Sequence, residues 1–154
     1  ALQHPPPPSA EELQRSALEF AAARLTEGRG LARAGCTLDA LECFEDALQR
    51  RVEALGDEHP SCVEALYECG LVCPDKERAV GLLKRCVAIE EKTRGELHSE
   101  TGQCMLGAGM ALVENGSEAE ALWMLARAAA AFEASVGKQD ARFKRAVNAM
   151  LDIM

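Results

Sequence analysis

Apolar residues recur every three to four positions along most of the chain, which is the spacing that places them on one face of an α-helix. The first such segment begins after Ser9, because Ser9 and Glu12 have the spacing of a capping box, and it continues past Gly28 and Gly30 to Ala34. A glycine inside a helix costs roughly 1 kcal/mol relative to alanine. We therefore expect another helix to pack closely against this glycine pair.

The pattern breaks at Gly35 and resumes in a second helix over about 38–55. The same spacing predicts five further helices, over about 61–73, 76–94, 99–114, 117–136 and 141–154. Hydrophobic residues make up 48% of the chain but aromatic residues only 4%, and alanine, leucine and glutamate dominate, as in helical proteins. We predict an all-α fold of three helix pairs and one solitary helix, which is the layout of a repeat array.

Superimposing the three pairs gives one pattern in their second helices, in which a small, a bulky and a small residue are spaced four and then three apart. The sets are Ala40, Phe44 and Ala47; Ala79, Leu83 and Cys86; and Ala121, Leu125 and Ala128. A glycine in each first helix, Gly28, Gly70 or Gly109, precedes the corresponding set by 12, 9 or 12 residues. The turn of the second pair is therefore predicted to be three residues shorter.

The joints between pairs also repeat. Gly56 precedes His59 in GDEHP, and 39 residues later Gly95 precedes His98 in GELHS. Glycine suits the left-handed end of a helix, and Pro60 suits the first turn of the next one. We expect each histidine, as a neutral imidazole, to hydrogen-bond a free backbone amide at the start of the following helix.

These features resemble the tetratricopeptide repeat (TPR), in which two antiparallel helices pack through such small positions. A length of 42 residues and the loop LGDEHP at 55–60 resemble kinesin light chain repeats, although the later joints read RGELHS and VGKQDA. The resemblance implies a right-handed superhelical array of three TPR hairpins plus a C-terminal capping helix. The predicted parts are a Pro-rich lead-in over 1–8, a repeat region over 9–140 with repeats at about 9–56, 57–95 and 96–137, and a capping helix over 141–154.

Charge and hydropathy exclude some partners. The net charge of -8 is spread along the chain and no basic stretch is present, so we expect no nucleic-acid partner. No apolar run approaches the roughly 20 residues that span a bilayer, so membrane insertion is not expected. Seven cysteines, an odd number in mostly apolar surroundings, favour a reducing compartment, the cytoplasm or the nucleus.

The reactive residue types give no catalytic or metal-binding arrangement. Cys62, Cys69 and Cys73 share one helical face near His59, but structural zinc sites usually bring cysteine pairs together from loops. No carboxylate or oxyanion hole is identified that would serve a cysteine nucleophile. We therefore predict buried cysteines between helices, with no enzymatic activity, no metal and no cofactor.

The resemblance places a binding groove on the concave face, which the first helices of such arrays line. With the three glycines taken as equivalent, the groove positions lie three residues before and one residue after each. These are Leu25 and Arg29, Tyr67 and Leu71, and Leu106 and Met110, with Arg33 one turn further. An apolar groove with a cationic rim at Arg29 and Arg33 would suit a short segment of another protein with apolar and acidic residues. The alternative is that these side chains only pack between repeats.

We therefore predict a non-catalytic protein-protein interaction adaptor or scaffold that holds a peptide segment of its partner in the concave TPR groove. One alternative is a histone chaperone of the TPR class, for which the charge of -8 would favour a basic client. That family carries a long acidic insertion in its second repeat, where this chain is shorter instead. A second alternative is a regulatory TPR domain of a larger enzyme, such as a SET and MYND lysine methyltransferase. The client and the oligomeric state stay open.

Overall fold

The computed structural model describes residues 3–154; Ala1 and Leu2, the start of the predicted lead-in, lie outside the described residues. The helices are α1 (Ala10–Arg33), α2 (Thr37–Leu55), α3 (Val63–Val72), α4 (Lys76–Arg94), α5 (Ser99–Glu114), α6 (Glu118–Ser135) and α7 (Ala141–Ile153), and a 3-10 turn, η1 (Pro60–Cys62), precedes α3. Ser9 and Glu12 form the predicted capping box at the start of α1. Residues 3–154 contain no strand, and the predicted all-α class is confirmed.

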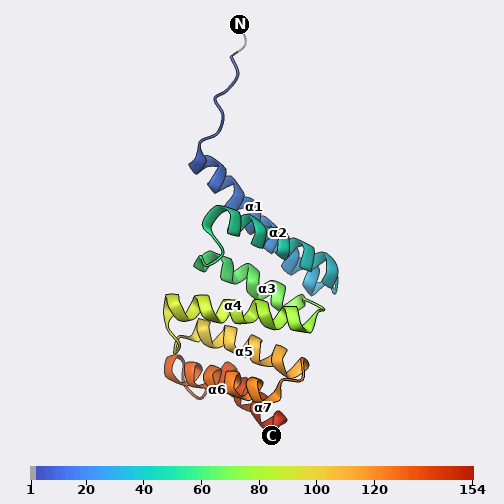
Figure 1. The fold of residues 1–154 in the computed structure, drawn as a ribbon, viewed down its shortest axis with the longest axis vertical. Helices are drawn as coiled ribbons and strands as arrows, with labels where there is room; N and C mark the ends of the chain where they lie inside the picture. Colours follow the sequence, from blue (N-terminus) through green and yellow to red (C-terminus); the bar gives the residue numbers. More distant parts are fainter. Residues whose placement is uncertain (1–2) are drawn as a thin grey trace.

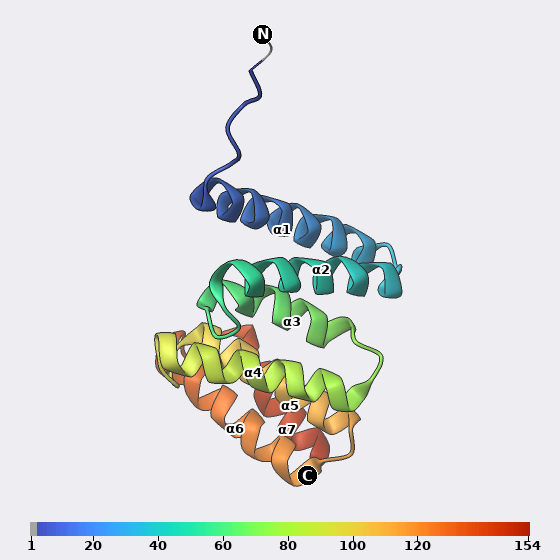
Figure 2. The ribbon, with the colours of Figure 1, turned by 45° about the horizontal axis from the view of Figure 1, so that its top comes forward.

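The helices pack in chain order into one elongated stack, with the extended lead-in leaving it at the α1 end (Figure 1). Each hairpin, α1 with α2, α3 with α4 and α5 with α6, falls inside one predicted repeat range, and α7 packs against α5 and α6. Figure 2 shows α4 and α6 on one side of the stack and α5 and α7 behind them. The predicted array of three hairpins and a terminal helix is therefore present.

The two layers of the stack are held differently. Among the odd-numbered helices, α3 contacts α5 and α5 contacts α7 directly. The even-numbered helices are bridged by long charged side chains, Arg78 of α4 to Glu45 of α2 at 2.7 Å and Lys84 of α4 to Glu120 of α6. The backbones of α3, α5 and α7 therefore lie closer together than those of the even helices. We call the surface of the odd-numbered helices the inner surface.

The helices of each hairpin meet where a glycine faces a bulky side chain. The pairs are Gly28 with Phe44, Gly70 with Leu83, and Gly109 with Leu125. A Cβ atom added to Gly28 would lie 2.6 Å from Cε1 of Phe44, closer than carbon atoms approach, and the other pairs are as tight. The predicted register is confirmed in all three hairpins. Gly30 has no heavy atom within 4 Å of such a Cβ, so the expected close packing holds only for Gly28.

The second repeat is shorter because of a helix and not because of a turn. The turns within the three hairpins have equal length, at 34–36, 73–75 and 115–117. Helix α3 ends two residues after Gly70, whereas α1 and α5 continue for five residues beyond their glycines. Pro74 disfavours helical geometry at the preceding residue, and Cys73 is indeed extended with ψ of 122°. The prediction of a shortened turn was therefore wrong.

The joints between repeats have one geometry. The helix before each joint is followed by a glycine of positive φ: Gly56 at 91°, Gly95 at 89° and Gly137 at 91°. Nδ1 of His59 and Nδ1 of His98 each accept a hydrogen bond from the backbone N–H two residues further on, at 3.1 and 3.0 Å. Asp140 occupies this place at the third joint and accepts from Arg142 N at 2.8 Å. The predicted role of both histidines is confirmed.

The glycine contact can be tested in α1. We expect Gly28→Ala to lower the free energy of unfolding by about 1–3 kcal/mol, because overpacking against Phe44 outweighs the gain of roughly 1 kcal/mol in helix propensity. Gly30→Ala, two residues away with open space around it, should raise the free energy by about 0.5–1 kcal/mol. Urea unfolding followed by circular dichroism measures both. Effects of equal sign and size would contradict the assigned contact.

A second prediction concerns the joint between the first two repeats. His59→Ala should lower the free energy of unfolding by about 0.5–1 kcal/mol, because Ser61 N then has no side-chain acceptor. His59→Asn keeps a short acceptor at the helix start, so it should lower the free energy of unfolding by less than His59→Ala. The comparison of the two variants by urea unfolding checks the cap, and an alanine variant as stable as the asparagine variant would refute it.

Candidate functional site

The predicted groove residues do not all reach the surface. Two of them, Leu25 and Leu106, are 1% and 2% exposed and belong to the hydrophobic core. The others are exposed or half-buried: Arg29, Arg33, Tyr67, Leu71 and Met110. The prediction that Leu25 and Leu106 face a groove is corrected, because neighbouring helices enclose this position. Tyr67, at the equivalent position of the second repeat, stays partly exposed because its side chain is longer.

The accessible residues border two separate hollows on the inner surface. Leu71 and Met110 border a hollow of about 90 Å³ beside the C-terminal end of α3, with Lys76 and Glu114 at its edge. Tyr67 and Arg29 border a larger cavity of about 290 Å³, lined from α1, η1, α3, α4 and α5. We call these the Leu71 hollow and the Tyr67 pocket. Arg33 lines neither.

Tyr67 forms a fixed wall of its pocket. Its hydroxyl oxygen accepts a hydrogen bond from Nε2 of Gln103 at 2.8 Å, which joins α3 to α5. The ring lies against Gly107, where an added Cβ would be 3.1 Å from Cε2 of Tyr67, so the absence of a side chain at Gly107 gives the ring its place. Burial raises the pKa of the Tyr67 phenol, and the hydroxyl therefore keeps its proton at neutral pH.

The charge of Arg29 is balanced inside the pocket. Its Nη2 lies 2.9 Å from Oε1 of Glu64, and its Nε lies 3.5 Å from Oε1 of Glu68. Both carboxylates are on α3, so these ion pairs link the first repeat to the second. Arg29 therefore offers little uncompensated charge to an acidic ligand, unlike the cationic rim expected from the sequence.

Glu90, near the end of α4, is the most buried carboxylate of the pocket and is only 4% exposed. Arg94 places its Nε 3.0 Å from Oε2 of Glu90, so the buried carboxylate is ion-paired with a cation of its own helix. Burial raises the pKa of the Glu90 carboxyl; the nearby cation of Arg94 opposes this shift, and the carboxylate of Glu100 adds to it. Glu90 is thus a buried, ion-paired carboxylate at the pocket wall.

Sequence reasoning overlooked Glu90, although its position carries a signal. Leu83, Cys86 and Val87 are buried on one face of α4, and Glu90 continues that face at the next helical step. Carboxylates are almost never fully buried unless they are paired. A glutamate that continues an apolar stripe is therefore a candidate for a special role.

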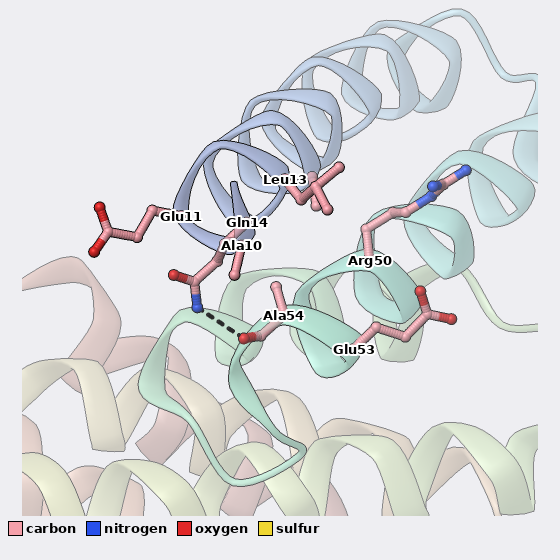
Figure 3. Close-up of a pocket in the computed structure, with 8 residues that line it drawn as sticks. Ala10, Glu11, Leu13, Gln14, Arg50, Glu53 and Ala54 are labelled. Atoms are coloured by element: carbon pink, nitrogen blue, oxygen red, sulfur yellow. Dashed lines mark hydrogen bonds between the residues drawn. The ribbon is translucent and has the colours of Figure 1, made fainter. Parts of the chain in front are cut away.

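A further cavity of about 460 Å³ lies at the outer end of the stack, between the start of α1 and the end of α2. Figure 3 shows Nε2 of Gln14 donating to the backbone oxygen of Ala54 across it, with Glu11 turned away; the N···O distance is 2.9 Å. The small side chains of Ala10 and Ala54 leave this space. We do not favour it as a binding site, because its wall has no buried polar side chain that a ligand could satisfy.

Five of the seven cysteines are core residues: Cys43, Cys62, Cys69, Cys86 and Cys104 are buried. The prediction of buried cysteines is wrong for Cys36, which is exposed, and for Cys73, which is half-buried beside the turn after α3. Burial raises the pKa of the Cys69 thiol to about 12, so that this thiol stays protonated. Residues 3–154 contain no group of three or more His, Cys, Asp or Glu side chains that could hold a metal ion. Within the same residues, no helix is both long enough and apolar enough to cross a bilayer.

Paired helices, glycine contacts and repeated joints together define a TPR-like helical repeat array. A solved structure with this arrangement comes from a Podospora anserina protein assigned to the kinesin light chains, with nearly identical TPR-like repeats. It superimposes with a TM-score of 0.75 and 20% sequence identity, over 94% of this chain and 74% of that one. The predicted TPR-like helical repeat fold is confirmed. No protein-family model and no curated protein sequence matches this chain.

The state of Glu90 predicts a pH-dependent difference in stability. Because the pKa of Glu90 is raised in the folded chain, its ionisation destabilises the fold above that pKa, and the penalty disappears as pH falls toward the unfolded value of about 4.3. Glu90→Gln should therefore be at least as stable as the parent chain at pH 7, with the difference shrinking toward about pH 4. Exposed Glu96→Gln is the control. Urea unfolding at both pH values tests this, and a clear loss of stability in Glu90→Gln at pH 7 would contradict it.

Proposed function

We propose that the chain is a non-catalytic scaffold that binds a segment of another protein across its inner surface. One observation carries the proposal: two hollows lie on the inner surface, and large apolar side chains stand exposed at one of them. Leu71 is 52% exposed and Met110 is 41% exposed. Stacked helix hairpins present extended surfaces of this kind, and partner proteins use them. The sharing of a fold with TPR-like repeats supports this proposal at the level of architecture.

The Leu71 hollow suits an apolar anchor. Leu71 comes from α3 and Met110 from α5, so one side chain of a bound segment could contact two repeats at once. Methionine is unbranched and adapts to the shape of an incoming side chain. Lys76 and Glu114, at the rim, offer one charge of each sign. The hollow therefore specifies an apolar residue in the partner and leaves its neighbours less restricted.

The two alternatives differ in how far the structure supports them. A basic client gains support from the excess of carboxylates in the Tyr67 pocket, but this alone does not single out histones. A regulatory role in a larger enzyme concerns a longer chain, and no feature of residues 3–154 favours it. The five buried thiols, which form no disulfide in the described residues, are compatible with the expected reducing compartment, cytoplasmic or nuclear.

The experiment compares the two sides of the stack with matched changes. A Leu71→Asp, Met110→Asp variant alters the inner surface, and Leu38→Asp changes a 71% exposed leucine on the even helix α2. Both are used beside the parent chain to capture proteins from cell extract, with quantitative mass spectrometry, after circular dichroism shows that they fold. We expect specific partners to fall at least about tenfold with the inner variant, the size of a lost hot spot, and to persist with Leu38→Asp. If the Leu71→Asp, Met110→Asp variant captured the same partners in the same amounts as the parent chain, the proposal would be overturned.

A further inference from the structure

The proline run Pro5–Pro8 is a feature of the chain that the stack of helices does not use. Residues 3–9 form no helix and no strand, and every one of them is exposed. Figure 1 and Figure 2 both show this segment leaving the start of α1 and running away from the other helices. The apolar proline rings are therefore available to another molecule.

The proline run is restricted to one extended conformation. Each proline ring holds φ near −65°, and each proline disfavours helical geometry at the residue before it. The result is a polyproline II helix, with about three residues per turn and a rise of about 3.1 Å per residue. Ser9, which follows the run, has φ of −67° and ψ of 163°, close to polyproline II values. Pro5 and Pro8 are one turn apart, so their rings lie on the same edge, about 9 Å from each other.

The start of α1 does not require the proline run. Glu12 N donates to Oγ of Ser9 at 3.1 Å, and Ser9 N donates to Oε2 of Glu12 at 3.0 Å. This capping box fixes the start of the helix by itself. Proline favours helix formation at the first helical position, but Ala10 occupies that position. The run lies before the cap, so its presence calls for another explanation.

A polyproline II segment of this kind is well suited to act as a ligand. Because its conformation is already fixed, little backbone entropy is lost when it binds. Its rings offer apolar surface, and its carbonyl groups can accept hydrogen bonds from tyrosine or tryptophan side chains. Grooves lined by aromatic side chains bind such segments in SH3, WW and EVH1 domains.

The charges beside the run indicate the rim of a matching groove. Glu11 and Glu12 follow within four residues of Pro8, and residues 3–14 contain no lysine or arginine. Glu12 is held in the capping box, whereas the carboxylate of Glu11 is turned away from the hollow between α1 and α2 (Figure 3). A groove with basic residues at its rim therefore complements this segment better than one with acidic residues.

We propose that Pro5–Pro8 binds as a polyproline II helix in the aromatic-lined groove of a partner domain, with Glu11 facing basic residues at the rim. The capping box joins this ligand directly to α1, without a flexible linker between them. The site is separate from the inner surface, so the chain can hold one partner at the inner surface and a second at the lead-in.

The test uses three purified domains as probes. An EVH1 domain and a WW domain are chosen for basic residues at the groove rim, and an SH3 domain is chosen for an acidic rim. Each is titrated into the ¹⁵N-labelled chain and followed by amide chemical shifts. We expect the EVH1 or the WW domain to give saturable shifts at Ser9 and Ala10, beside the run, and to bind at least about fivefold more tightly than the SH3 domain.

Variants separate the proline ligand from other contacts. A Pro5→Ala, Pro8→Ala variant should weaken binding at least about fivefold, and Glu11→Lys at least about twofold. The Leu71→Asp, Met110→Asp variant is the matched control and should bind the domains like the parent chain. Circular dichroism should show unchanged helix content in the proline variant, because the capping box is intact.

Two results would overturn the proposal: no saturable shift with any of the three domains, or equal binding by the proline variant and the parent chain. If the Leu71→Asp, Met110→Asp variant still loses its captured partners in that case, the scaffold function stands and only the proline ligand fails. Loss of the scaffold function alone would leave the binding of the three domains unaffected.

Discussion

Contact between a glycine backbone and a bulky side chain fixes the distance between the two helices of every hairpin. In the second repeat, Gly70 leaves room for Leu83 where a single methyl group would collide with it. Because this contact recurs three times in one register, the hairpins are alike enough to stack, and stacking places the odd helices side by side. The hollows of the inner surface, between those helices, are consequences of that spacing.

Features set by short stretches of chain were predictable from sequence. Helical periodicity gave the helix pairs, and the histidine caps followed from the residues beside Gly56 and Gly95. The burial of Leu25 and Leu106 was not predictable in this way, because it depends on packing between layers that no local spacing encodes. The shortened α3 was misassigned for a related reason, since an interval between two residues does not show which element lost the missing positions.

The residues of the candidate site also divide into those predictable from nearby sequence and those that depend on packing between helices. Tyr67 was identified from its register with the repeat glycines, but Arg29 was taken for a free cation because its partners Glu64 and Glu68 lie more than 30 positions along the chain. Ion pairs between repeats form only when the repeats stack. They change the net charge of a surface, and the residues near one partner in the sequence do not reveal this change. Glu90 continues an apolar stripe and could have been noticed in the sequence, but its burial at the pocket wall depends on how the helices pack.

The even-numbered and the odd-numbered helices are held together by different interactions, and these respond differently to salt. The even-numbered helices are bridged by partly exposed ion pairs such as Arg78 with Glu45, which contribute little individually and weaken as salt screens them. The odd helices α3, α5 and α7 touch directly through packed side chains, whose attraction is insensitive to salt. A rise in ionic strength would therefore weaken the ties between even helices, and the pairs of Arg29 with α3, more than the direct contacts among α3, α5 and α7.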